Sequence, residues 1–152
     1  MKIPKEILNS VPFQYAADVK SGKIVTGLRI KQAVDRFYKL IETADEKGYW
    51  LDHKKGFAII RFFENFLTHT KGKSAGTAFS LAPFQQFRFY NTYAWQTTNE
   101  EGVAIRLIRN VYVKIGKKNG KTAEEAGDGL FLMAFDNEAG AEVYIGATKE
   151  EQ

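Results

Sequence analysis

The stretch from residue 104 to residue 147 restricts the fold most, because the spacing of its apolar residues changes twice. Alternating apolar and β-branched residues predict a strand over 104–115, bent near Arg109. A turn rich in glycine and lysine follows over 116–120, and helical spacing then predicts a helix over 121–135. A short apolar run over 141–147 predicts another strand. Strand, turn, helix and strand in this order predict one βαβ unit, and hence an α/β fold.

The turn between the predicted strand and helix carries residues suited to binding phosphate. The sequence from Val111 to Thr122 reads VYVKIGKKNGKT. A phosphate-binding loop in this setting exposes backbone N–H groups, and the following helix directs its positive end at the anion. A lysine then contacts the terminal phosphates and a hydroxyl binds magnesium. Gly120, Lys121 and Thr122 provide the last three elements of the G-x-x-x-x-G-K-[ST] pattern.

The first half of that pattern departs from the standard form. Its first glycine would fall at Ile115, whereas the glycine is one place later, at Gly116. A basic turn without a ligand is the alternative interpretation, because Lys-Asn-Gly-Lys suits a tight turn with positive φ at Asn119 or Gly120.

The remainder of the chain has mainly helical patterns. Residues 1–27 contain two prolines and two glycines, which predicts mostly loop with at most a short helix. Apolar residues three and four apart predict helices over 28–42 and over 54–69, the second capped by Asp52 and packed on the first. Pro83 begins a third predicted helix, which is rich in aromatic residues and runs to Trp95.

Composition excludes several kinds of site. The 152 residues include no cysteine and two histidines, so disulfides, thiolate zinc sites and cysteine nucleophiles are excluded. No apolar run approaches the roughly 20 residues that span a bilayer. The net charge of +4 permits contact with a polyanion but does not establish it.

Five separated segments together resemble the terminase large subunit, the DNA-packaging ATPase and nuclease of tailed phages. They occur in the family's order with its approximate spacing, so the resemblance extends over nearly the whole chain. The segments are Asp18–Ile24 (DVKSGKI), His69–Gly76 (HTKGKSAG), Leu81–Gln85 (LAPFQ), the loop Gly116–Thr122 and Ala141–Lys149 (AEVYIGATK). The resemblance implies a helical N-terminal segment followed by the first βαβ unit of a P-loop NTPase with a truncated sheet. The expected division is a mainly helical lead-in over 1–100 and a partial P-loop ATPase core over 101–152.

The resemblance also implies site residues, with ATP and Mg²⁺ as cofactors. The catalytic candidates are Lys117 and Lys121, and Thr122 is the magnesium ligand. The nucleotide-binding candidates are Gln85, Gly116, Lys118, Asn119, Gly120, Lys121 and Thr122. Gln85 follows an aromatic residue as the family's adenine-reading glutamine does, and an amide can both donate to and accept from the adenine edge. Lys117 stands where many relatives have arginine, and lysine cannot form a bidentate clamp.

Hydrolysis in this class also needs an acidic strand end that holds magnesium and a carboxylate that positions water. No apolar strand ending in Asp-Glu follows the loop, and Glu124 and Glu125 fit better as a solvated helix start. A fragment is therefore expected, one that binds nucleotide but is not hydrolytically complete alone. Its exposed sheet edges would need covering helices or oligomerisation.

The expected partners are viral double-stranded DNA, the terminase small subunit and the portal protein, with no membrane. The expected location is the host cell cytoplasm, for a phage or prophage gene product. A non-enzymatic basic module that binds DNA or packaging proteins is the alternative. Its candidate contacts are Lys71, Lys73, Lys114, Lys117, Lys118 and Lys121. A head-assembly protein unrelated to nucleotide is a third possibility.

Overall fold

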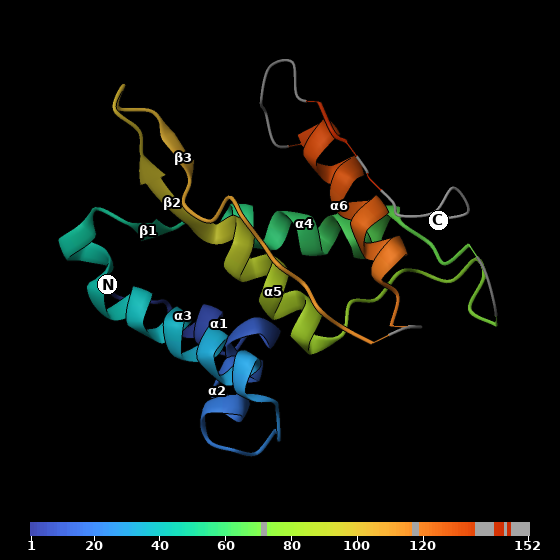
Figure 1. The fold of residues 1–152 in the computed structure, drawn as a ribbon, viewed down its shortest axis with the longest axis horizontal. Coiled ribbons are helices and arrows are strands. Elements are labelled where there is room, and N and C mark those ends of the chain that lie inside the picture. Colours follow the sequence, from blue (N-terminus) through green and yellow to red (C-terminus); the bar gives the residue numbers. More distant parts are fainter. Residues whose placement is uncertain (71–72, 117–118, 136–141, 145, 147–152) are drawn as a thin grey trace. The chain divides into compact units, whose positions relative to one another are not determined.

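The computed structural model describes residues 1–70, 73–116, 119–135, 142–144 and 146. The chain forms two compact units, Met1–Tyr112 and Val113–Gln152, and each is described by itself. The elements in order are α1 (Lys5–Leu8), α2 (Val11–Lys20), α3 (Leu28–Lys47), β1 (Trp50–Leu51), α4 (His53–Phe66), α5 (Pro83–Ala94), β2 (Trp95–Thr98), β3 (Ala104–Arg106) and α6 (Lys121–Phe135) (Figure 1).

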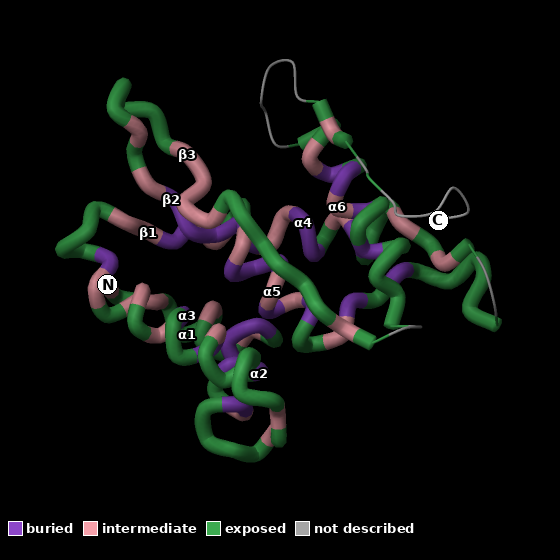
Figure 2. The backbone as a smooth tube through the Cα atoms, in the orientation of Figure 1, coloured by how far each residue is buried: buried purple, intermediate pink, exposed green. Residues whose placement is uncertain are grey.

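Helix α5 is the centre of the first unit. It packs against α4 on one side and α2 on the other, and α2 also packs against α3. The aromatic residues of α5 explain this position, because Phe87, Phe89 and Tyr90 are each at most 5% exposed. The rings of Phe13 and Phe37 join them through edge-on contacts. The buried stretches in Figure 2 accordingly run along the facing sides of these helices.

Gly56 lets α4 approach α5 closely. A Cβ atom at this position would lie 2.7 Å from the Cβ of Ala94 and 2.8 Å from the ring of Tyr90. Such distances are shorter than any van der Waals contact, so only glycine fits between the two helices here.

A small antiparallel sheet extends from the end of α5. Its strand order is β1-β2-β3, with Leu51 opposite Trp95 and Thr98 opposite Ala104. A tight turn joins β2 to β3, in which the side chain of Asn99 accepts from two backbone N–H groups and Gly102 has φ of +79°. This hairpin belongs to the first unit.

The hairpin changes the fold expected around residues 104–115. The strand begins at Ala104 as predicted but ends at Arg106, and it pairs antiparallel with β2. Residues 107–116 have no regular secondary structure, and neither do 142–144 and 146, whereas residue 145 lies outside the described residues. The helix Lys121–Phe135 has the predicted bounds. The parallel βαβ unit is therefore not shown, because the expected first strand finds its partner in the preceding segment.

Other expectations from sequence need correction in the first unit. Residues 1–27 hold two helices rather than mostly loop, since Pro4 is the N-cap of α1 and Pro12 lies in the first turn of α2, where the missing N–H costs nothing. Helix α4 packs mainly on α5 rather than on α3. Helix α3 continues to Lys47, and Gly48 ends it with φ of +67°.

Helix α6 buries a different face from its apolar one. Its buried residues include Gly127, Gly129 and Phe131. Leu130 and Met133, by contrast, are 52% and 63% exposed. Gly129 leaves room for the chain that follows, since a Cβ at this position would lie 3.3 Å from the side chain of Val143.

Candidate nucleotide site

Asn119 and Gly120 directly precede α6, a 15-residue helix. The side-chain amide of Asn119 donates to the carbonyl of Gly116 at 3.2 Å. Gly120 has φ of +75°, as the tight-turn interpretation predicted, and its carbonyl accepts the first helical hydrogen bond from Glu124. Positive φ next to a helix start is the backbone shape that turns successive N–H groups toward one side.

The lysine and threonine of the pattern lie in the first turn of α6. Lys121 and Thr122 are both exposed, at the end where the helix has its positive pole and its first N–H groups have no helical partner. A cation, a hydroxyl and backbone N–H groups therefore lie together at residues 120–123. This set of groups suits a phosphate with its magnesium ion. Lys117 and Lys118 lie outside the described residues.

Glu124 corrects one expectation for this region. It was expected on a solvated helix start, but it is 2% exposed, whereas Glu125 is exposed. Its carboxylate folds back toward the loop, because a Cβ at Gly120 would lie 3.9 Å from Oε1 of Glu124.

Gln85 has a structural role in α5. It is 8% exposed, and its side-chain oxygen accepts from the backbone N–H of Ala82 at 2.6 Å. That bond satisfies a donor at the N-terminus of α5, where Ala82 itself offers no side-chain acceptor. One side-chain group of Gln85 is thus engaged within its own helix.

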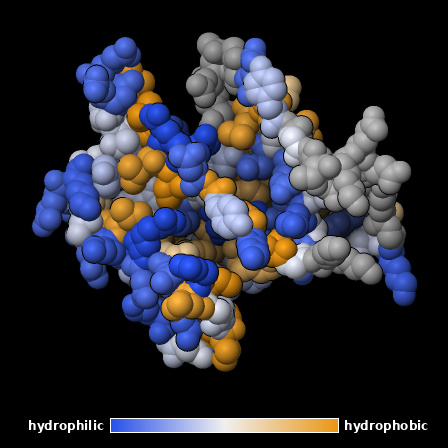
Figure 3. Space-filling view, viewed as in Figure 1, coloured by the Kyte–Doolittle hydropathy of each residue, from blue (hydrophilic) through white to orange (hydrophobic). Residues whose placement is uncertain are grey.

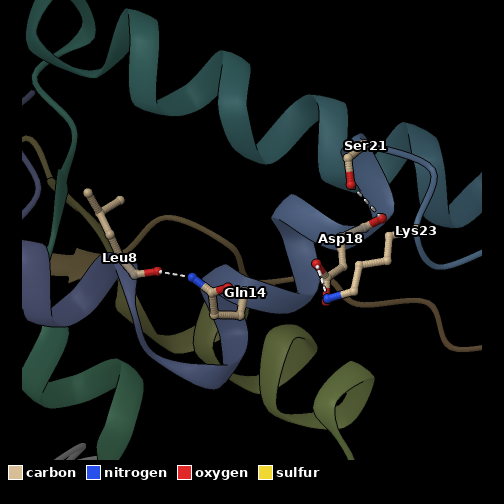
Figure 4. Close-up of polar contacts among 5 residues, drawn as sticks. All are labelled: Leu8, Gln14, Asp18, Ser21 and Lys23. Atoms are coloured by element: carbon tan, nitrogen blue, oxygen red, sulfur yellow. Dashed lines mark hydrogen bonds and ion pairs between the residues drawn. The ribbon is translucent and has the colours of Figure 1, made fainter.

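The segment Asp18–Ile24 ends α2 in a compact loop (Figure 4). Lys23 Nζ lies 3.1 Å from both carboxylate oxygens of Asp18, and the Ser21 hydroxyl donates to the Asp18 carbonyl at 3.2 Å. Gly22 has φ of +80°. The polar residues of this segment therefore have a structural role, because their contacts close the turn that leads into α3.

The segment His69–Gly76 lies in the loop between α4 and α5, whose two ends pair with each other as in a hairpin. Thr68 and Ala78 form an antiparallel bridge, and the N–H of His69 donates to the carbonyl of Thr77 at 2.9 Å. The His69 ring stacks on Phe79 with centroids 4.5 Å apart. Lys73 is exposed, whereas Lys71 lies outside the described residues.

Sequence reasoning missed a polar pair in the first unit. The hydroxyl of Tyr90 lies 2.5 Å from Nδ1 of His53, and burial lowers the pKa of His53 while the neighbouring Asp52 partly opposes this. Burial raises the pKa of Tyr90. Nothing in the spacing of residues 53 and 90 indicates that they meet. An open hollow of about 400 Å³ beside His53 is lined by Pro4, Glu6, Ile7, Trp50, Leu51, Asp52, His53 and Lys54.

Two features are missing from the described residues. Among the described residues, the histidine, aspartate and glutamate side chains form no group of three or more that could hold a metal ion. Among the helices in the same ranges, none combines the length and apolar character that crossing a membrane requires.

Residues 83–152 match the family model described as the ATPase domain of the terminase large subunit. The matched part contains α5, the loop before α6 and α6 itself. This part of the chain is therefore similar to the ATPase domain of the terminase large subunit, the family that the sequence motifs resemble. No curated protein and no solved structure matched the chain.

Proposed function

We propose that the chain binds Mg-ATP through the loop Gly116–Thr122, as part of an ATP-driven motor that packages viral DNA into proheads. The match of residues 83–152 to an ATPase domain carries this proposal, because the matched part includes this loop in front of a helix. Hydrolysis by this chain alone is not part of the proposal.

The residues at the start of α6 support a phosphate site built from a lysine, a hydroxyl and backbone N–H groups. Lys121 would place its ammonium group against the terminal phosphates, and the hydroxyl of Thr122 would bind magnesium. The N–H groups at the start of α6 would donate to the phosphate oxygens, favoured by the positive pole of the helix. Magnesium supplies charge neutralisation of the phosphates when it is bound. Both side chains are exposed, so the approach of a ligand to them is open.

Further roles follow from the family. Lys117 would contact the γ-phosphate, and Lys118 and Asn119 would complete the loop. Gln85 would read the adenine. Because its oxygen accepts from Ala82, that role requires either the amide nitrogen alone or a change of partner when adenine binds.

Isothermal titration of Mg-ATP into the wild type, Lys121→Ala and Lys114→Ala tests the nucleotide site. Lys114 is exposed and lies two residues before the loop, so its substitution removes the same charge outside the proposed site. We expect Lys121→Ala to weaken the binding of Mg-ATP at least tenfold. Lys114→Ala should leave the affinity within about twofold, since salt largely screens an exposed charge that does not contact the ligand. Equal affinities for all three proteins, or no binding by the wild type, would remove the proposal.

The family resemblance also proposes partners. Viral double-stranded DNA, the terminase small subunit and the portal protein are the expected ones. The alternative, a basic module that binds DNA without nucleotide, differs by predicting DNA binding that needs no Mg-ATP and that weakens steeply with added salt. Of its candidate lysines, Lys73 and Lys114 are exposed.

A further inference from the structure

The charges of α3 run against the dipole of their own helix. A helix is stabilised by acidic residues at its amino end and basic residues at its carboxyl end. The first twelve residues of α3, 28–39, hold four basic residues and one acidic residue, whereas the last eight, 40–47, hold three acidic residues and one basic residue. The first turn contains no acidic residue, and the N-cap, Gly27, provides no side-chain acceptor. This arrangement lowers the stability of α3, so the stability of the helix does not explain it.

Three of the basic residues form one stripe on the exposed side. At 3.6 residues per turn, Arg29, Arg36 and Lys39 lie within a sector of about 80°, which also contains Gln32 and faces away from the buried side chains of Val34 and Phe37. All three basic residues are exposed. The stripe is about 15 Å long, since each residue adds about 1.5 Å.

The stripe is not neutralised by neighbouring carboxylates. The acidic residue of this half, Asp35, forms an ion pair with Lys20 of α2, and the nearby Lys23 pairs with Asp18. Within the described residues no ion pair involves Arg29, Arg36 or Lys39, and Arg29 instead donates to Gln32 at 3.1 Å. Asp35 and Asp18 thus neutralise Lys20 and Lys23, and the stripe keeps its charge.

We propose that the stripe Arg29–Arg36–Lys39 binds the phosphodiester backbone of duplex DNA. Duplex DNA presents about one negative charge per 1.7 Å of its axis, so a row of cations about 15 Å long meets several phosphates. Contacts to the backbone position a protein without reading sequence. An anionic membrane surface fits less well, because the apolar face of α3, with Val34, Phe37 and Ala44, is buried in the core and has no part to insert into lipid.

The test measures binding of the full chain to a fluorescently labelled duplex DNA of about 20 base pairs by anisotropy, at several salt concentrations. The proteins are the wild type, the triple variant Arg29→Gln/Arg36→Gln/Lys39→Gln and the control Lys47→Gln. Lys47 is exposed on the same helix, at its acidic end. We expect the triple variant to lose more than tenfold in affinity near 0.1 M salt and to reduce the salt slope by about 2 to 3, because each phosphate contact adds about 0.9 to it. Lys47→Gln should match the wild type.

Two further readouts separate this loss from misfolding and from failure at the nucleotide site. Because the three cations oppose the helix dipole, the triple variant should melt at the same temperature as the wild type or higher. Its affinity for Mg-ATP should equal that of the wild type. The proposal is overturned if the triple variant keeps the affinity and salt slope of the wild type, if the wild type does not bind the duplex, or if it binds only vesicles of anionic lipid.

Discussion

Gly56 is the residue whose replacement the packing of the first unit tolerates least. The substitution Gly56→Ala would gain about 1 kcal/mol of helix propensity, but its methyl group would overlap Ala94 and the ring of Tyr90. Overpacking of a core costs about 1–3 kcal/mol. Both neighbours lie on α5, so the whole helix, rather than one flexible side chain, would have to shift to relieve the overlap. The overpacking cost should therefore lie at the upper end of this range, about 3 kcal/mol. After the gain of about 1 kcal/mol in helix propensity, we expect a net loss of about 2 kcal/mol in the free energy of unfolding, measured by urea denaturation.

Gly27→Ala is the control for this prediction. A Cβ at Gly27 meets nothing within 4 Å and the residue has φ of −68°, so only the modest preference for glycine at the N-cap of α3 is lost. This control should cost less than about 1 kcal/mol. A Gly56→Ala protein as stable as the wild type would show that there is room for a methyl group between Gly56 and α5, and would contradict the close approach of the two helices.

His53 gives the stability of the first unit a dependence on pH. Burial lowers its pKa in the folded chain, so below the unfolded value of about 6.5 the unfolded chain binds more protons than the folded one. Stability should therefore fall as the pH decreases from about 6.5, and should change little through this residue above that pH. The pairing of Nδ1 with the Tyr90 hydroxyl gives the same direction if the hydroxyl donates to the neutral ring.

Melting temperatures at pH 7.5 and pH 5.5 for the wild type and His53→Gln measure this effect. We expect the wild type to lose more on acidification than His53→Gln, which has no proton to take up at this position. An identical decrease in both proteins would assign the pH dependence to other groups.

Among the elements, α4 begins at a cap whose strength can be measured. The carboxylate of Asp52 accepts from the N–H of Lys55 at 3.0 Å. Asp52→Ala should lower the free energy of unfolding by about 1 kcal/mol, whereas Asp52→Asn should keep most of it, because asparagine caps as well as aspartate. Urea denaturation compares the three proteins. Equal losses for alanine and asparagine would point to the charge of Asp52 rather than to its hydrogen bond.

The sequence was sufficient to predict the Asp52 cap and the longer helices. Helical spacing located α3, α4 and α5 to within a few residues and α6 to its bounds, because these segments repeat apolar residues over several turns. Over residues 1–27 the sequence predicted mostly loop with at most a short helix, whereas the structure has both α1 and α2. Pro12 does not break α2, because it lies in the first turn of that helix. The strand over 104–115 was predicted too long because alternation cannot tell which partner a strand finds, and β3 pairs over three residues with β2.

The candidate site was only partly predictable for related reasons. A glycine with positive φ at residue 120 follows from local turn chemistry, which the sequence contains. Burial of Glu124 and capping by Gln85 depend on what packs around each side chain, and no pattern of spacing indicates that. The binding roles of Gln85, Lys121 and Thr122 remain predictions.

At the scale of the whole molecule, the two units are joined by a stretch of chain whose residues 109–114 are all exposed. Tyr112, the last residue of the first unit, is 89% exposed. In the described part of the chain no backbone hydrogen bond holds residues 108–115, and the last one before them joins Leu107 to Trp95. Proteases cut such segments first, because they must bind extended, accessible backbone.

Limited digestion with chymotrypsin should therefore cut first after Tyr112, and Tyr112→Ser should remove this cut, as mass spectrometry of the products can show. Both tryptophans, Trp50 and Trp95, belong to the first unit, so their fluorescence reports on that unit alone. Because α2, α4 and α5 pack on one another within the first unit, the urea midpoint followed by fluorescence should stay nearly the same after the cut. A first cut within α4 or α5, or a large drop in that midpoint, would contradict two separately folded units.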